Sequence, residues 1–335
     1  MNEKTAVVIL NWNGKSFLEQ FLPSVTQHTV NAQIIVADNN STDDSISFLK
    51  TNYPQIEIIK LDKNYGFAGG YNKALKEVKS EYYVLLNSDV EVTENWLNPI
   101  IELLDSDHSI VACQPKIKDY NNNTYFEYAG ASGGFIDKYG YPFCRGRIFD
   151  ELEEDKGQYN DATEIFWASG ACFVIRASAY HNIGGLDEFY FAHMEEIDLC
   201  WRLKNQGYKI MVYPSSTVYH LGGGTLNKVN PRKTFLNFRN SLLTLHKNLS
   251  KKDRFGIIFI RLCLDGIAGA KFLLTGKPKH TWAIVRSHFA FYGALSQNKL
   301  KRITPENPNL KGLINKSIVK EHVIKKKNTF NDLLK

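Results

Sequence analysis

The chain has 335 residues, of which 43% are hydrophobic and 23% are charged, a composition typical of a folded globular protein of one large domain or two. Its five cysteines are scattered and form no Cys-x-x-Cys pair, which argues against a disulfide framework or a zinc knuckle and for a reducing compartment. No apolar run approaches the roughly 18 residues that predict a membrane-spanning helix. The N-terminus lacks the apolar segment of a signal peptide, so we expect neither feature.

The net charge of +6 is unevenly distributed along the chain. Residues 231–335 hold 22 Lys and Arg against 5 Asp and Glu, a net of +17, whereas residues 1–230 hold 19 against 30, a net of −11. Such a split indicates two regions with different partners. We therefore predict an N-terminal domain over residues 1–230 and a basic, helical C-terminal region over residues 231–335 that faces an anionic partner.

Strand-like and helix-like segments alternate in the first 90 residues. The strand-like runs are β-branched and continuous, which is typical of strands covered on both faces. The alternation predicts an α/β fold with an open, mostly parallel sheet and helices on both sides. The turn after the first strand has one glycine and not the G-x-G-x-x-G of a dinucleotide-binding fold, so NAD is not expected. The expected strands are 5–10, 32–39, 56–61 and 82–89, and the expected helices are 16–28, 41–52 and 67–80.

The remainder of the chain is less regular. Residues 120–160 are rich in Asn, Gly, Tyr and Asp and predict loops and short hairpins, and residues 164–180 predict a strand, a turn and a strand. Polar clusters follow all four N-terminal strands. In open α/β sheets ligands bind beyond the carboxyl ends of the strands, so four successive clusters predict one crevice. The clusters are residues 11–13, 38–43, 64–67 and 87–89.

The order and amino-acid sequences of these clusters resemble those of the family 2 glycosyltransferases, inverting enzymes of the GT-A fold. Within that family they resemble the bacterial rhamnosyltransferase and galactofuranosyltransferase-like branch. The resemblance is close over residues 5 to about 225 and looser in the tail. It implies transfer of a sugar from a UDP- or dTDP-sugar to a saccharide or polyprenyl-linked acceptor in cell-surface polysaccharide assembly. The matching stretches are VVILNWNG, VADNNSTDDS, NYGFAGGYN, LLNSDV, ASGACFVIR, GGLDEFYFAHMEEIDLCWR and VYHLGG.

The resemblance implies a divalent cation, Mn²⁺ or Mg²⁺, held by Asp89 and His220. Asp89 ends the stretch NSD, which occupies the position of the family's Asp-x-Asp motif, and His220 lies in VYHLGG. A cation on the diphosphate would stabilise charge as the glycosidic bond breaks, and carboxylate and imidazole are ligands that manganese accepts. The alternatives are a solvated turn for Asp89 and a structural histidine for His220. Asn87 departs from the acidic pattern and is expected to bind ribose or water.

Four further residues are implied nucleotide contacts, namely Asn11, Asp38, Asn64 and Gly66. Asp38 ends the second strand and resembles the carboxylate that accepts the N3–H of uracil or thymine. Its alternative role is to cap the following helix. Asn64 and Gly66 precede the next helix, where the alternative is a plain helix start.

An inverting displacement also needs a carboxylate that removes the proton of the acceptor hydroxyl. Glu195, Glu196 and Asp198 begin a predicted helix, where close carboxylates raise one another's pKa and the helix dipole opposes that rise. In the family the second acidic residue is the base, which here is Glu196, one methylene longer than the usual aspartate. Glu195 or Asp198 as the base, or plain helix capping, are the alternatives. Arg202 is expected to pair with the acids of its own helix.

Residues 254–277 have helical spacing, with Arg254, Arg261, Asp265 and Lys271 on one narrow stripe and nearly everything else apolar. Such a helix is too charged to span a bilayer and too apolar for an ordinary surface helix. It would either pair with residues 281–296 or lie in the membrane interface. The surrounding positive charge favours an anionic membrane and a peripheral position on its cytoplasmic face. The alternative is a core or dimer helix with a basic solvent face.

Two other functions remain open at this point. A nucleotidyltransferase shares the nucleotide-binding α/β architecture, but it attacks phosphorus and has no need of the paired MEEID and VYH stretches. A sugar-binding protein without activity is the second alternative, supported only by the departures at Asn87 and Glu196. No nucleic acid partner is expected.

Overall fold

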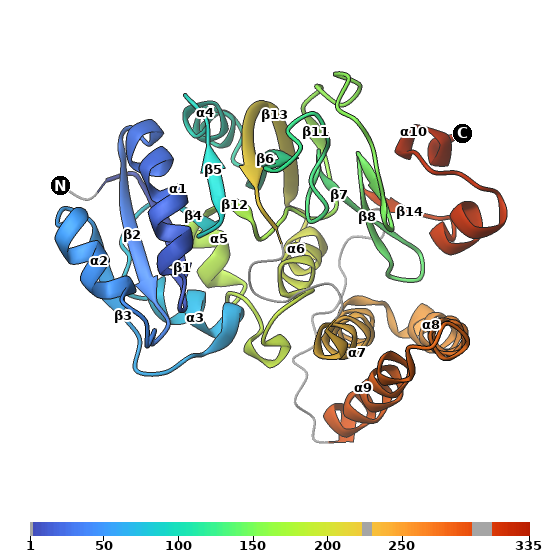
Figure 1. Cartoon of the computed structure of the whole chain (residues 1–335). Helices are drawn as coiled ribbons and strands as arrows, with labels where there is room; N and C mark the ends of the chain where they lie inside the picture. The colour runs from blue at the N-terminus through green and yellow to red at the C-terminus, as the bar shows by residue number, and fades with distance from the viewer. Residues whose placement is uncertain (1–2, 223–229, 297–309) are drawn as a thin grey trace.

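The computed structural model describes residues 3–222, 230–296 and 310–335. Gly223, the last residue of the VYHLGG stretch, lies outside the described residues. A mixed open sheet crosses the molecule with helices on both sides (Figure 1), in the strand order β11-β13-β6-β12-β4-β1-β2-β3, with β5 paired to β13. The predicted α/β class with a mostly parallel sheet at the N-terminal end is confirmed.

The first four strands run parallel, with β1 between β2 and β4. Because side chains alternate along a strand, Val7 and Ile9 face α1, α2 and α4 whereas Ala6 and Val8 face α3 and α6. The strands are β1 (Thr5–Asn11), β2 (Ala32–Asp38), β3 (Glu57–Lys60) and β4 (Tyr82–Asn87). The helices are α1 (Lys15–His28), α2 (Ser45–Asn52), α3 (Gly66–Ala74), α4 (Asn98–Ser106) and α6 (Glu195–Asn205).

Two helix starts differ from the prediction. Helix α2 begins at Ser45 and not at residue 41, because the Asp43 carboxylate accepts from the backbone N–H and hydroxyl of Ser45 and holds the preceding residues in a turn. Helix α3 begins at Gly66, one residue before the predicted start, and ends at Ala74, before the predicted end at residue 80. A Cβ on Gly70 would lie 2.8 Å from the Leu10 side chain, so glycine there lets α3 pack closely on β1.

In the other half of the sheet, β13 ends close to the carboxyl end of β4, where β5 begins. β12 runs antiparallel between β4 and β6, and β13 runs parallel to β6. The short β5 turns back after β4 and pairs antiparallel with the end of β13, with His220 opposite Val90. The elements are β5 (Val90–Val92), β6 (Ile110–Asp119), β11 (Thr163–Glu164), β12 (Cys172–Arg176), α5 (Ala177–Asn182), a 3-10 turn (Glu188–Tyr190) and β13 (Lys209–His220).

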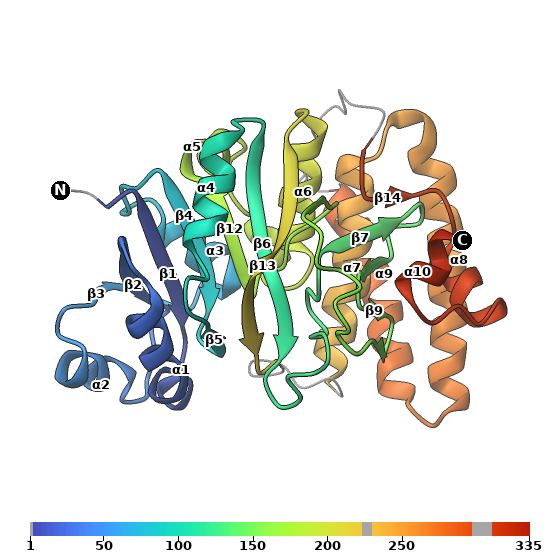
Figure 2. The ribbon, with the colours of Figure 1, turned by 90° about the horizontal axis from the view of Figure 1, so that it is seen from above.

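A second, smaller sheet has the order β10-β9-β8-β7-β14, and its first four strands are the short hairpins predicted for residues 120–160. Its last strand comes from the C-terminal end of the chain, and Phe330 packs on Phe135 with 4.7 Å between ring centroids. The tail therefore returns to the N-terminal domain (Figure 2). The strands are β7 (Gly134–Asp137), β8 (Pro142–Cys144), β9 (Arg147–Ile148), β10 (Glu151–Leu152) and β14 (Leu313–Ile314), followed by a π-helix (Lys320–Ile324) and α10 (Phe330–Leu334).

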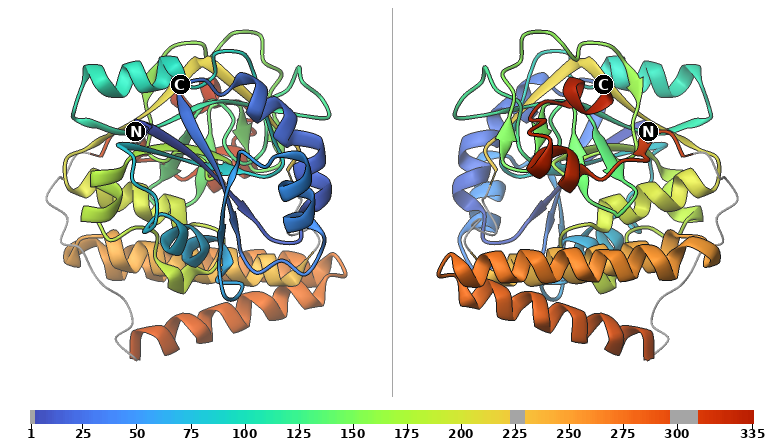
Figure 3. Two further views of the ribbon diagram at one scale, coloured as in Figure 1. Left: turned by 90° about the vertical axis from the view of Figure 1, so that its left-hand side faces the viewer. Right: turned by 90° about the vertical axis from the view of Figure 1, so that its right-hand side faces the viewer.

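Three long helices, α7 (Pro231–Asn248), α8 (Lys251–Leu274) and α9 (Pro278–Ser296), form a layer along one side of the molecule (Figure 3). Helix α9 packs on both α7 and α8, so the structure has the helix pairing that the sequence left open as one of two arrangements for residues 254–277. Among the described residues, no helix is long and apolar enough to cross a membrane.

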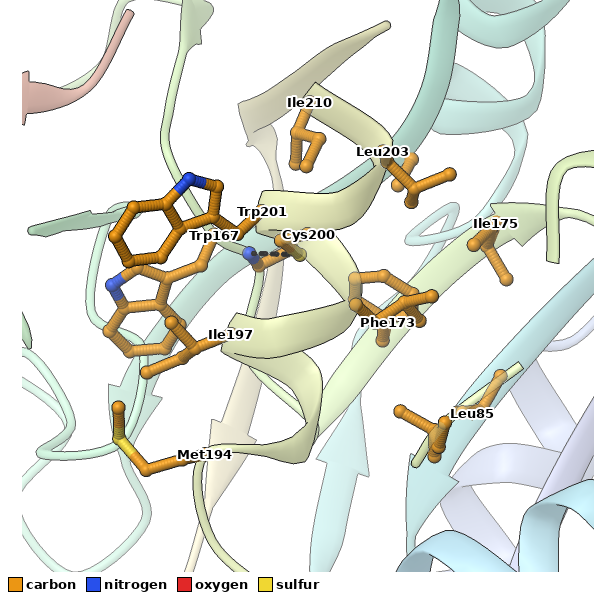
Figure 4. Packing of buried hydrophobic residues seen from close by; sticks show 14 of the residues in the cluster. Leu85, Trp167, Phe173, Ile175, Met194, Ile197, Cys200, Trp201, Leu203 and Ile210 are labelled. Atoms are coloured by element: carbon orange, nitrogen blue, oxygen red, sulfur yellow. Dashed lines mark hydrogen bonds between the residues drawn. The ribbon is translucent and has the colours of Figure 1, made fainter. Parts of the chain in front are cut away.

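Helix α6 is fixed against the sheet by its apolar face (Figure 4). Ile197, Cys200 and Trp201 are buried beside Trp167 and Phe173, and the backbone N–H of Ala168 donates to the Cys200 sulfur. This packing determines where the first turn of α6, with its three acidic residues, lies relative to the strand ends.

Candidate active site

The ends of β1 and β2 form the first part of the site, because Asn11 and Asp38 lie opposite each other in the parallel register. The side-chain amide of Asn11 donates to Asp38 Oδ1 and to Ser41 Oγ, each over 3.1 Å, and the Ser41 backbone N–H donates to Asp38 Oδ2 over 3.0 Å. Both side chains are almost completely buried. The Asp38 carboxylate is thus held in one orientation at the strand end.

The start of α3 is the second part of the site. The Asn64 side-chain carbonyl accepts from the backbone N–H of Gly66 over 2.8 Å, and Asn39 donates to Asn64 and to the Gly66 carbonyl. Gly66 has φ +71°, and a Cβ there would lie 2.7 Å from the Phe191 ring. The Phe67 N–H donates to the Phe191 carbonyl. The loop before α6 therefore touches the predicted nucleotide side directly.

Asp89 and His220 meet where β5 pairs with β13. Nε2 of His220 lies 3.2 Å from Asp89 Oδ1, and Nδ1 lies 3.3 Å from Glu127 Oε1. All three side chains are buried. The backbone N–H of Asn87, at the end of β4, donates to the Ala171 carbonyl, and the residue is half-buried.

The two carboxylates control the charge of this histidine. Burial disfavours the charged imidazole, but Glu127 and Asp89 outweigh burial and raise the pKa of His220 to about 10. For Asp89, burial alone would raise the pKa, but the hydrogen bond and charge of His220 lower it. A ring clamped between two carboxylates in this way has a fixed orientation.

The donor atoms of this group fit a divalent cation. A carboxylate beside an imidazole is a set that manganese accepts, and a carboxylate behind the second ring nitrogen is the usual support of a metal-bound histidine. Within the described ranges, no group of three or more His, Cys, Asp or Glu side chains is placed to hold a metal by itself. A cation bound here would take its other ligands from the substrate.

The first turn of α6 holds two glutamates that form no ion pair with any described residue. Glu195 is buried and Glu196 is half-buried, and Oε2 of each lacks a hydrogen-bond partner among the described residues. Burial raises the pKa of Glu196 to about 7. Burial, and next the charge of Glu196, raise the pKa of Glu195 well above its ordinary range. These are the features of a carboxyl group suited to proton transfer near neutral pH.

Asp198 has a different environment from the two glutamates. It is fully buried, and its carboxylate accepts from Arg202 over 2.8 Å, from Lys247 over 2.8 Å and from Asn248 over 2.9 Å. Burial would raise the pKa of Asp198, but these cations and hydrogen bonds lower it. The predicted pairing of Arg202 with an acid of its own helix is confirmed. Asp198 ties α6 to α7.

The loop that leads into α6 is strained. Phe191, His193 and Met194 all have positive φ, between 67° and 73°, which costs free energy for residues other than glycine and is common at functional sites. The side-chain amide of Asn240 in α7 donates to the carbonyls of Tyr190, Ala192 and His193 over 2.7 to 3.2 Å. One buried side chain of α7 thus holds the turn in front of the glutamates.

Sequence reasoning missed Glu127 and Asn240. Glu127 lies in the loop-rich segment after β6, where no periodic pattern assigns a partner to an isolated acid. Asn240 lies within a polar face of α7 and has no local signal that distinguishes it from a solvated residue. Only the folded chain brings them to His220 and to the loop before α6.

Comparison with known proteins identifies the family of the chain. The family model described as glycosyl transferase family 2 matches residues 6–184. The N-acetylglucosaminyl-diphospho-decaprenol L-rhamnosyltransferase of Mycobacterium tuberculosis is 24% identical over 66% of this chain and 76% of its own length. The rhamnosyltransferase WbbL of Escherichia coli is 23% identical over 64% of this chain and 82% of its own length.

Two solved structures share the fold. TarS residues 1–349 of S. aureus, in complex with UDP-GlcNAc, superpose with a TM-score of 0.58 at 15% identity over 87% of this chain and 81% of that chain. The mannosyltransferase PcManGT of Pyrobaculum calidifontis, in complex with GDP-Man and Mn²⁺, gives a TM-score of 0.53 at 14% identity over 89% of this chain and 88% of that chain. The chain is therefore a GT-A-fold protein that belongs to glycosyl transferase family 2.

Proposed function

We propose that this enzyme transfers a sugar from a UDP- or dTDP-sugar, with inversion, to a saccharide or polyprenyl-linked acceptor in the assembly of a cell-surface glycan. The observations that carry the proposal are two glutamates with raised pKa in the first turn of α6 and an Asp89–His220 pair at the end of β13. The names of the mycobacterial and Escherichia coli relatives support rhamnose chemistry and, for the former, a lipid-linked acceptor.

In the nucleotide half of the site, Asp38 would accept the N3–H of the uracil or thymine, because Asn11 and Ser41 already hold its carboxylate in place. Asn64 and Gly66 would border the nucleotide through the start of α3, and Asn87 would face the ribose or a bound water. These assignments rest on the resemblance and on the common location of the residues.

The divalent cation, Mn²⁺ or Mg²⁺, would be held by Asp89 and His220. When bound, it would supply positive charge to the departing nucleoside diphosphate. Glu127 would orient the His220 ring. Because His220 must be neutral to bind a metal, cation binding would release the proton that the two carboxylates hold on the ring in the metal-free protein.

On the acceptor side, Glu196 would take the proton of the attacking hydroxyl. The hydroxyl oxygen then forms a bond to the anomeric carbon on the face opposite the nucleoside diphosphate, and the carbon–oxygen bond to the diphosphate breaks, which inverts the configuration. Burial would keep the pKa of the base high, and Glu195 lies next to it in the first turn of α6. Asp198 is committed to Arg202 and Lys247 and would position the helix.

The enzyme would work at the cytoplasmic face of the membrane, as a peripheral protein. The five cysteines are free, which suits a reducing compartment, and the basic region over residues 231–335 suits an anionic lipid surface.

A panel of UDP- and dTDP-sugars, incubated with the enzyme and Mn²⁺, tests this function. We expect slow, metal-dependent release of nucleoside diphosphate from the correct donor, even without acceptor. Release of sugar 1-phosphate in place of nucleoside diphosphate, which follows from attack on the α-phosphorus, would identify a nucleotidyltransferase. Tight binding of a sugar nucleotide without release of either product would identify a binding protein.

A further inference from the structure

The polarity of α8 is inverted relative to an ordinary surface helix. Arg261 and Asp265 are buried on its inner side, where Arg261 donates to Asp265 and to the carbonyls of Tyr139 and Gly140 and lies 3.8 Å from the Tyr141 ring centre. His288 of α9 also reaches Asp265. The middle of the predicted charged stripe, Arg261 and Asp265, therefore faces the protein interior. The alternative in which these residues form a basic face toward solvent is wrong.

The outer side of α8 and α9 is apolar instead. Of the fifteen large hydrophobic side chains that are exposed in the described part of the chain, nine lie on these two helices. Between Phe255 and Leu274, every exposed residue of α8 is uncharged except Lys271. We call these nine residues the outer face. They are Phe255, Phe259, Ile260, Ile267, Leu273, Leu274, Trp282, Phe289 and Tyr292.

A groove of about 670 Å³ opens beside the outer face, between the beginnings of α7 and α9. Arg232, Lys279 and Arg286 line it together with Phe235 and Trp282, and Trp282 also belongs to the outer face. None of the described residues that line the groove is acidic. Arg232 and Arg286 lie over aromatic rings, and within the described ranges none of the three cations pairs with a carboxylate.

The groove adjoins the loop before α6. The ring under Arg232 is Phe191, at 5.2 Å, and Phe191 is one of the strained residues just before Glu195 and Glu196. A ligand in the groove therefore lies next to the loop that precedes the two glutamates.

We propose that the groove binds the phosphate of a membrane lipid while the outer face enters the interface of an anionic bilayer. Three cations that pair with no carboxylate in the described part of the chain surround an apolar groove, which matches a phosphate that carries a hydrocarbon chain. Trp282 and Tyr292 are side chains favoured at membrane interfaces. A second copy of the chain does not match, because it would bring two regions of net charge +17 together. The inference deepens the proposed function, since it gives a lipid-linked acceptor its place beside Glu196.

Vesicle co-sedimentation of the full chain tests the inference. The expected result is binding to phosphatidylglycerol vesicles, weaker at high salt, and little binding to phosphatidylcholine vesicles. Phe259→Ser with Phe289→Ser, and separately Lys279→Glu with Arg286→Glu, should each weaken binding by about tenfold or more. The control for the phenylalanine pair is Val30→Ser with Leu334→Ser, which removes exposed apolar groups elsewhere. The control for the basic pair is Lys50→Glu with Lys76→Glu, which makes a matching charge reversal within residues 1–230.

Two further arms identify the phosphate. Phosphatidylcholine vesicles that contain a few per cent of polyprenyl phosphate should recruit the enzyme if the lipid-linked acceptor occupies the groove, and phosphatidylglycerol alone suffices if a bulk phospholipid does. In either case the lysine and arginine reversals must weaken binding. Glycerophosphate binding to the groove without any vesicle binding would overturn the proposal.

Other outcomes also contradict it. Equal vesicle binding by the test and control pairs would mean that another surface binds lipid. A wild-type dimer that becomes monomeric in the Phe259→Ser and Phe289→Ser variant, measured by light scattering, would show that the outer face binds a second copy. Release of nucleoside diphosphate by the wild type tests the proposed sugar transfer separately. The lipid-binding proposal can therefore fail while the proposed function holds, and the reverse is also true.

Discussion

At the scale of single residues, Glu196 is the side chain whose chemistry is most open to test. Its pKa is raised to about 7, so the fraction of unprotonated base, and with it the transfer rate, should rise from pH 5.5 and level off above about pH 8. Glu196→Gln cannot accept a proton, and we expect a rate at least about 100-fold lower at pH 8, with donor affinity little changed. If Asp198→Asn abolishes transfer and Glu196→Gln retains it, the base has been misassigned.

Glu195 should limit stability at alkaline pH. Burial, and next the charge of Glu196, raise its pKa above the unfolded value near 4.5, so the folded state binds this proton more tightly than the unfolded state. The resulting stability is fully present below pH 4.5 and is lost as the pH rises through the raised pKa. At pH 8, Glu195→Gln should therefore melt about 2 °C or more above the wild type, and this gain should shrink at pH 4.5. A lower melting temperature at pH 8 would show that the ionised carboxylate is stabilised.

Glu127 should act through His220 without touching substrate. Glu127→Gln keeps the shape but removes the charge behind Nδ1, which makes the imidazole a weaker metal ligand. We expect the Mn²⁺ concentration for half-maximal activity to rise by about 10-fold or more, with the rate at saturating metal mostly restored. A purely structural role would instead lower the rate at every metal concentration and leave the half-maximal concentration unchanged.

At the scale of elements, α7 fixes the loop before α6 through one amide. Asn240→Ala leaves the carbonyls of Ala192 and His193 without this donor, so the strained turn should relax and move the glutamates. We expect kcat to fall by about 10-fold or more while the donor KM changes little. Leu236→Ala, a cavity variant in the same helix, is the control, because it loosens α7 without removing a bond to the loop.

The elements also show which parts of the site are predictable from sequence. The strand ends at Asn11, Asp38 and Asn87 could be predicted, because continuous apolar runs stop abruptly there and parallel strands place their ends together. It could not be predicted that the face of α8 that carries Arg261 is turned toward the protein interior. Helical spacing determines which residues share a face but not whether that face is turned toward the core. Similarly, Glu127 reaches His220 through the pairing of β6 with β13, because its backbone N–H donates to the Ile117 carbonyl of β6.

At the scale of the whole molecule, the proposed site draws on three parts of the fold. Asp38 and Asp89 belong to the strand ends, the two glutamates to α6, and the basic groove to the start of α7 and α9. Under the proposed function, the strand ends would bind the nucleotide, α6 would supply the base, and the groove would bind a lipid phosphate.

One measurement tests the central claim most directly, namely metal-dependent activation of a sugar nucleotide at the Asp89–His220 pair. Nucleoside diphosphate release from the best donor is followed for the wild type and Asp89→Ala, with Mn²⁺ and with chelator. We predict that release is lost with chelator, returns with added Mn²⁺ or Mg²⁺, and is nearly absent in Asp89→Ala although the variant melts normally. Full release in chelator, or an Asp89→Ala enzyme as active as the wild type, would contradict the account.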